Sequence, residues 1–297
     1  MRQSSDSGSS VVIGFVILLM VIALGIGIWA LISLPAEMKE AESTHTIGLS
    51  NAFLDLKLSA DKVRVNNFEG ARFSMLMPGS SGMSGTTIQF TEDTGGELFL
   101  YREEAPTVNL IPSTMNAEVG RLSAQIGGTR GTTVIGYEGG GVFRSDSGNA
   151  VWLTPGLLQI YPDATQSNAT IRIDLVLINM SGSTETSSNW GVPIDCVYLG
   201  STYDITQSMN DTTLTLSFQS SDPKQQNLWS EMFAEAVARY PAEVAAFEMA
   251  NPGKAVPEVT LTSEEAKLKI SVGGNNWVKV YMRDAAYDVS LVNRYGG

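Results

Sequence analysis

The feature that most constrains this chain is an apolar run near its N-terminus, which extends from Val11 to Leu34. The run contains no charged residue, and Ser33 is its only polar side chain. As a helix rising about 1.5 Å per residue it would be about 36 Å long, enough to cross a hydrocarbon core of roughly 30 Å with some tilt. We therefore expect a polar leader over residues 1–10 and a transmembrane helix over residues 11–34.

The flanks of the run indicate which side of the membrane the remainder faces. The few Lys and Arg residues beside it, together with the free amine, slightly favour a cytoplasmic N-terminus. Three Asn-X-Ser/Thr sequons lie beyond the run, at Asn168, Asn179 and Asn210, and such sites are used for N-glycosylation only outside the cell. We expect a single-pass protein of the cell membrane with an extracellular C-terminal domain and the lipid bilayer as a partner.

Residues 35–63 continue with a helical pattern and are expected to form an amphipathic stem helix. The first half is polar and contains His45, the only histidine, which we expect to be solvated because no second metal ligand lies near it. In the second half apolar residues recur three and four positions apart, which predicts one buried stripe. The stripe consists of Leu49, Phe53, Leu56, Ala60 and Val63.

From residue 64 to residue 297 the pattern changes to the twofold alternation of β-strands. Gly95-Gly96 and Gly139-Gly140 predict the turns of two similar hairpins. A helical insertion near 223–250 is expected as two consecutive helices, opened by Asp222-Pro223. The sequence thus predicts an α+β fold whose mainly antiparallel, β-rich outer domain is sandwich-like or an open barrel. The expected strands lie at 71–77, 86–91, 97–101, 120–127, 132–137, 141–144, 150–153, 156–161, 169–179, 192–199, 213–220, 258–262, 267–272, 277–282 and 286–293.

Charge and rare residues limit the chemistry available to the chain. The net charge is −12, which argues against a nucleic-acid partner because phosphate binding needs clustered Lys and Arg. The single cysteine rules out an intrachain disulfide, and with only one histidine beside it a histidine-based triad has few residues to draw on and a zinc site fewer still. Cys196 lies in an apolar run and is expected to be a buried small side chain. We predict no catalytic residue, no metal site and no cofactor.

Several motifs have a structural interpretation that is simpler than a functional one. The glycine-rich segment 136–141 lacks the strand-to-helix context and the Lys-Ser/Thr of a phosphate loop, so we expect a turn. Residues 163–168 lack the central Gly and terminal Glu of a calcium loop and are expected to form a polar turn. The pairs Glu103-Glu104 and Glu264-Glu265 are expected at solvated edges. Trp190 lies in a polar loop, where an aromatic ring could contact a ligand.

The N-terminal segment GSSVVIGFVIL, residues 8–18, resembles the signature of archaeal type IV pilin-like proteins. The resemblance implies cleavage by a prepilin-type peptidase, with Gly8 as the last leader residue and Ser9 as the first mature residue. It also implies self-association with pilin-like subunits through the N-terminal helix. The chain has Ser7 where the family usually has a basic residue and Val11 where an acidic one is common.

A second resemblance covers the outer domain and names no activity. Residues 132–155 and 171–183 are similar to uncharacterised archaeal membrane proteins that share this pilin-like start. Together these features favour a non-enzymatic, membrane-anchored archaeal surface protein with a structural, assembly or adhesion role. The alternative is a membrane-tethered extracellular module that binds a carbohydrate, a peptide or an ion.

Overall fold

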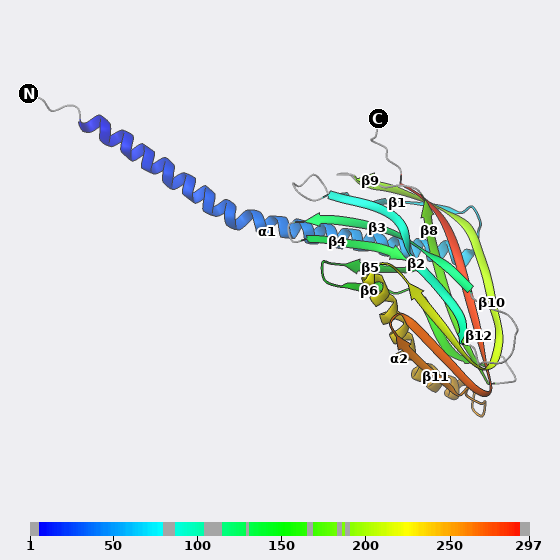
Figure 1. The fold of residues 1–297 in the computed structure, drawn as a ribbon. Helices are drawn as coiled ribbons and strands as arrows, with labels where there is room; N and C mark the ends of the chain where they lie inside the picture. The colour runs from blue at the N-terminus through cyan, green and yellow to red at the C-terminus, as the bar shows by residue number, and fades with distance from the viewer. Residues whose placement is uncertain are drawn as a thin grey trace, which may run out of the picture. The chain divides into compact units, whose positions relative to one another are not determined.

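The computed structural model describes residues 6–79, 87–103, 115–128, 131–164, 169–182, 186–187 and 191–291. The chain divides into two compact units, Met1–His45 and Thr46–Gly297. The first helix, α1 (Asp6–Asn66), contributes residues to both units (Figure 1). The compact β-rich unit therefore includes the second half of the predicted stem helix.

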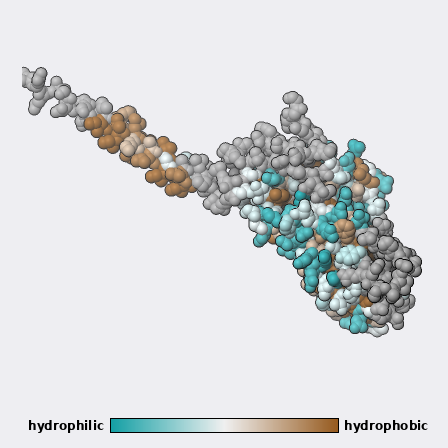
Figure 2. All heavy atoms as spheres, viewed as in Figure 1, coloured by the Kyte–Doolittle hydropathy of each residue, from teal (hydrophilic) through white to brown (hydrophobic). Residues whose placement is uncertain are grey.

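In the first unit, α1 carries the apolar segment Ile13–Ser33, which the chain itself leaves unburied. Within the described residues it is the one helix long and apolar enough to cross a membrane, as the uncharged run predicts. Its large side chains are exposed, and Figure 2 shows them as hydrophobic surface. Such a surface is stable only when lipid or other apolar groups cover it.

In the second unit, the end of α1 is a core helix. Leu49, Phe53, Leu56 and Ala60 have no exposed surface, and Val63 is half-buried against them. These are the stripe residues predicted from their spacing, so that prediction is confirmed. Burying each of the larger side chains contributes about 1.5–3 kcal/mol to stability.

Twelve strands in the described part of the chain form one curled sheet in the order β6-β5-β4-β3-β2-β10-β12-β8-β7. β1 pairs with β10, β11 with β12 and β9 with β2. Adjacent strands run antiparallel except for the parallel pair β8 and β12, which confirms a mainly antiparallel fold. The bounds are β1 (Arg72–Met77), β2 (Thr87–Glu103), β3 (Met115–Gly128), β4 (Gly131–Glu138), β5 (Gly141–Ser145), β6 (Ala150–Thr154), β7 (Leu157–Asp163), β8 (Thr170–Gly182), β9 (Thr186–Ser187), β10 (Val192–Gln219), β11 (Val259–Glu264) and β12 (Lys267–Leu291).

The long strands explain why the described part of the chain forms one curled sheet rather than a two-sheet sandwich, the first of the two expected alternatives. The segments predicted as separate strands at 192–199 and 213–220 both belong to β10, and those at 267–272, 277–282 and 286–293 fall on β12 as far as the described residues extend. Register shifts in β10 let it bend without ending. Segments that a sandwich would place in two separate sheets are therefore parts of the same strands, β10 and β12.

The two Gly-Gly segments differ, contrary to the prediction of two similar hairpins. Gly139 and Gly140 have φ angles of +55° and +96° and form the expected turn between β4 and β5. Gly95 instead lies inside β2 at a register shift, and a Cβ there would lie 2.5 Å from a carboxylate oxygen of Glu138. This glycine permits a close approach and does not reverse the chain.

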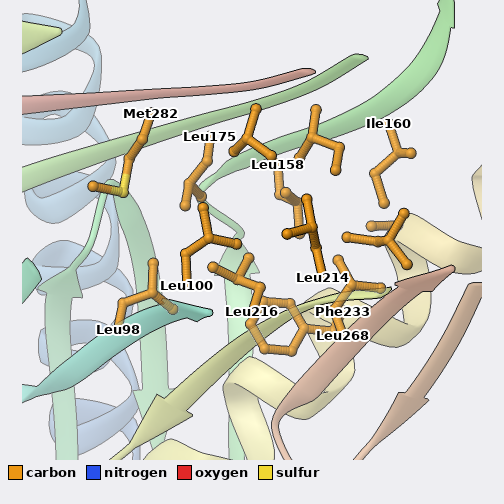
Figure 3. Packing of buried hydrophobic residues seen from close by; sticks show 14 of the residues in the cluster. Leu98, Leu100, Leu158, Ile160, Leu175, Leu214, Leu216, Phe233, Leu268 and Met282 are labelled. Carbon is orange, nitrogen blue, oxygen red and sulfur yellow. The ribbon is translucent and has the colours of Figure 1, made fainter. Parts of the chain in front are cut away.

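Two hydrophobic cores lie on opposite faces of the sheet. The α1 core contains the buried stripe of α1 with Ile178 and Met180 of β8, whereas the α2 core contains Leu175 and Leu177 of the same strand. Because successive residues of a strand point to opposite faces, α1 and α2 cover opposite sides. Figure 3 shows the α2 core, with Phe233 among the leucines of the strands.

α2 (Pro223–Ala250) is one helix, which corrects the prediction of two. Asp222 caps it as expected, since its Oδ1 accepts a hydrogen bond of 2.9 Å from the Lys224 amide. Pro241 lies inside the helix, where it removes one amide donor. The helix continues past Pro241 because Tyr240 and Phe247, on either side of it, are both buried. One face of the helix packs into the core: Leu228, Trp229, Met232, Phe233 and Ala236 are buried, and Val237 is half-buried.

Candidate functional site

The candidate residues named from the sequence fall in different parts of the chain. Gly8 and Ser9 lie within α1, where the structure describes their backbone only. Asn168 and Trp190 lie outside the described residues, and Asn210 lies in β10 without a described side chain. Leader cleavage and glycosylation therefore stay predictions.

Asn179, the remaining sequon residue, joins three strands. Its Oδ1 accepts a hydrogen bond of 3.0 Å from the Gly120 amide of β3, and its Nδ2 donates one of 2.8 Å to Asp284 Oδ1 of β12. A Cβ on Gly120 would lie 2.6 Å from the Met180 carbonyl oxygen, so only glycine permits this approach of β3 to β8. A glycan attached to Nδ2 would replace one hydrogen of the group that bonds Asp284. The sequon pattern gave no indication of this structural role.

Cys196 and the Glu264-Glu265 pair have the environments that the sequence predicts, whereas His45 and Asp163 do not. Cys196 is buried, and burial raises the pKa of its thiol to about 12, so it is not a reactive thiolate near neutral pH. Glu264 and Glu265 are exposed, as predicted for a solvated edge. His45 is half-buried rather than solvated. Asp163, at the start of the predicted polar turn, is buried at the end of β7.

Glu138 is the centre of a closed polar network between α2 and the sheet. The carboxylate is fully buried, and Trp229 Nε1 of α2 donates a hydrogen bond of 2.8 Å to its Oε1. With the Gln225 amide oriented to suit its neighbours, its nitrogen donates to Glu138 Oε2 at 2.8 Å and its oxygen accepts from Arg121 Nη1 at 2.8 Å. The network anchors α2 to β3 and β4, because a buried carboxylate is stable only with such donors.

A polar cleft of about 540 Å³ adjoins this network at Gly95. Its lining includes Glu97 and Glu118, which are directly opposite each other on β2 and β3. Like charges in such a pair are destabilising. The described residues contain no group of three or more ligands able to hold a metal ion there or elsewhere. Two carboxylates in an open cleft do not define a binding site.

A smaller groove, which we call the Arg172 groove, is lined by positively charged and aromatic side chains. It has a volume of about 190 Å³ and lies on the same sheet face as α1, near the end of that helix. Three arginines and one aspartate line it, in a chain whose net charge is −12. The lining residues are Arg64 of α1, Leu157 of β7, Arg172, Asp174, Leu175 and Val176 of β8, and Tyr281 and Arg283 of β12.

Arg172 is held in place from three directions. Its Nε donates a hydrogen bond of 2.8 Å to Asp174 Oδ1, two residues along the same strand face. Its guanidinium carbon lies 4.0 Å from the centroid of the Tyr281 ring, within the range of a cation–π contact, and 5.8 Å from that of Tyr161. Tyr161 donates from its hydroxyl to Asp174 Oδ2 at 2.6 Å. The strand pairing places all four residues together, because Tyr161 is the partner of Arg172 and Tyr281 is the partner of Asp174.

Contacts within the cluster of Tyr161, Arg172, Asp174 and Tyr281 determine the protonation states of Tyr161 and Arg172. Burial, followed by the hydrogen bond to Asp174, raises the pKa of Tyr161 above its ordinary value, so the hydroxyl keeps its proton. The hydrogen bond to Asp174 raises the pKa of Arg172. The groove therefore keeps a charged guanidinium beside a protonated phenol across the physiological pH range.

Arg64 of α1 adds a second cation to the lining of the groove. Its side chain is 11% exposed, and its Nη2 lies 3.5 Å from Asp61 Oδ1. Its Nε is buried and has no hydrogen-bond acceptor among the described residues. A buried donor without an acceptor is destabilising, so this nitrogen would gain from a negative charge nearby.

Local sequence signals reveal only part of this groove. The alternating segment IRIDL places Arg172 and Asp174 on one strand face. Their contact with Tyr281 depends on the parallel pairing of β8 with β12, which joins segments distant in sequence. Comparison with known proteins adds no assignment: no family model matches the chain, and no curated protein or solved structure matches it.

Proposed function

We propose that this chain is a single-pass membrane-anchored, pilin-like archaeal cell-surface protein with a structural, assembly or adhesion role. The observation that supports this best is the uncovered apolar helix Ile13–Ser33, which precedes a unit with two hydrophobic cores of its own. Exposing this segment to water would be strongly unfavourable, at roughly 25 cal/mol per Å² of apolar surface. The bilayer, or the matching helices of other copies, covers it, and the β-rich unit faces outward.

Cell fractionation and mass spectrometry of the native protein test this proposal. We expect the protein in the membrane fraction, soluble only with detergent, and accessible to protease added to intact cells. We also expect the mature chain to begin at Ser9. A freely soluble monomer would overturn the anchor, protection from protease would overturn the outward orientation, and an intact Met1 would overturn pilin-type processing.

A second candidate function is a membrane-tethered binding module, which the Arg172 groove favours. A rigidly held guanidinium, an aromatic ring and a further cation meet there in a partly enclosed space. Such a small set of convergent polar groups is typical of ligand sites. Calorimetric titration of the detergent-solubilised chain with neutral and acidic sugars, peptides and ions tests this function. Saturable binding of any of them supports it, and no binding in the whole panel overturns it.

A further inference from the structure

We propose that the Arg172 groove binds the oxyanion, a carboxylate or a phosphate, of a small ligand. This inference rests on the second proposed function, the binding module, and specifies its ligand chemistry. It does not depend on the anchor, because every residue that lines the groove belongs to the unit Thr46–Gly297.

The first argument is that the two terminal nitrogens of Arg172 have N–H donors that no described residue uses. Its Nε is used by Asp174, while no atom of the described residues accepts a hydrogen bond from its two terminal nitrogens. The side chain is 32% exposed, and Arg172 is one of the residues that line the groove. A guanidinium offers a planar pair of N–H groups that matches the two oxygens of a carboxylate or phosphate.

The second argument is that this guanidinium is already fixed in place. Stacking on Tyr281 and bonding to Asp174 restrict the rotamers that a free surface arginine would sample. A ligand therefore loses less free energy to ordering the site when it binds. Both oxygens of Asp174 are already occupied, one by Arg172 and the other by the Tyr161 hydroxyl, so this carboxylate does not compete for a ligand cation.

The third argument is charge. The lining contains Arg64, Arg172 and Arg283 and the carboxylate of Asp174, and Asp61, 3.5 Å from Arg64 Nη2, offsets part of this charge. The buried Nε of Arg64 has no acceptor in the described part of the chain. An anion in the groove would interact favourably with these cations in a site partly shielded from water. The chain as a whole is acidic, so this local excess of positive charge is opposite in sign to the net charge of −12.

Size selects a small occupant. The volume of about 190 Å³ is below the roughly 300–1,000 Å³ of pockets that enclose drug-sized ligands. The groove therefore holds one charged group with few further atoms, such as inorganic phosphate or a single uronic-acid sugar.

Calorimetric titration of the full chain in detergent tests the proposal with three probes at constant ionic strength. The probes are inorganic phosphate, D-glucuronate and D-glucose, the neutral sugar that matches glucuronate. We expect saturable binding of phosphate or glucuronate, or both, and none of glucose; the response to phosphate against glucuronate separates the two sources of the oxyanion. Binding of glucose as tight as that of glucuronate, or binding of neither anion, would overturn the inference.

The variant Arg172→Gln locates the binding. It removes the charge and the terminal donor pair, and we expect at least a tenfold loss of affinity for the anion. The matched control is Arg239→Gln, which removes an exposed arginine from α2 and leaves the groove intact. If Arg172→Gln does not fold, Arg172→Lys keeps the charge without the planar donor pair and is expected to bind more weakly than the wild type. Unchanged affinity in the folded variant would overturn the proposal.

The outcomes separate this inference from the proposed functions. Membrane fractionation without anion binding leaves the anchor proposal in place and removes only the ligand assignment. Binding of a sugar, peptide or cation that Arg172→Gln leaves unchanged keeps the binding module and rejects this groove as its site.

Discussion

The Glu138 network and the Arg172 groove use similar residues to opposite effect. Both combine a carboxylate, an arginine and aromatic side chains on the same sheet. In the Glu138 network the carboxylate is fully buried and receives donors from α2, so the network joins helix to sheet. Around Arg172 the carboxylate is satisfied but donors remain on the arginine. An excess of accessible donors over acceptors distinguishes a candidate binding site from a structural anchor.

The largest expected loss of stability follows from removing the carboxylate at the centre of the Glu138 network. Glu138→Ala leaves the buried donors of Trp229 and Gln225 without an acceptor, and we expect the free energy of unfolding to fall by about 3–5 kcal/mol. Denaturant titration measures this change. Glu231→Ala, at an exposed position of the same helix α2, serves as control and should change stability by less than about 0.5 kcal/mol. A loss below about 1 kcal/mol at Glu138 would show that the network is not an anchor.

A smaller loss is expected at the bridge between β3 and β8. Asn179→Ala removes the acceptor of the Gly120 amide and the donor to Asp284, which should cost about 1–3 kcal/mol. Denaturant titration of this variant is compared with Gln125→Ala, at an exposed position of β3. Equal stability of the two variants would mean that Asn179 does not hold the curled sheet together.

The Arg172 groove should tolerate the equivalent change. Arg172→Gln breaks a partly exposed ion pair with Asp174, and we expect a loss of only about 0–1 kcal/mol of stability. The same denaturant titration as for Glu138 checks this, with Arg239→Gln as the reference variant. A loss as large as that of Glu138→Ala would make Arg172 an anchor too and would erase the contrast between the two sites.

The smallest effect concerns Tyr161 at high pH. Burial and Asp174 raise its pKa in the folded state above the unfolded value near 10. Tyr161 therefore contributes its full stabilisation below about pH 10 and loses it as the pH rises through the folded-state pKa. Between about pH 9 and about pH 11 the wild type should lose more stability than Tyr161→Phe. Parallel losses in the two proteins would contradict the raised pKa.

Sequence patterns correctly predicted those features of the fold that depend on interactions between residues close together in the chain. The stripe of α1, the Asp222 cap and the Gly139-Gly140 turn follow from spacing and backbone preference within a few residues. Gly95-Gly96 carries a similar turn signal, yet both residues lie inside β2, where Gly95 is close to the Glu138 carboxylate of β4. The bulges of β10 likewise resemble strand ends, because only the continuous pairing with β12 shows that the strand does not stop.

The Arg172 groove could not be predicted from the sequence, because it too depends on contacts between segments distant in sequence. Arg172 and Asp174 share a face by alternation, and an acidic chain gives no reason to single out one arginine. Their partner Tyr281 is brought to them by the parallel pairing of β8 with β12, and Arg64 by the packing of α1 on the sheet. Neither long-range arrangement is encoded in a short segment.

The strands β10 and β12 line both cores, and this limits how the protein can be divided. A cut within either strand would leave two incomplete halves, each exposing apolar residues that its partner half normally covers. We expect the unit Thr46–Gly297 to unfold in a single thermal transition. A fragment expressed for laboratory work therefore has to begin before Leu49 and extend through Leu291.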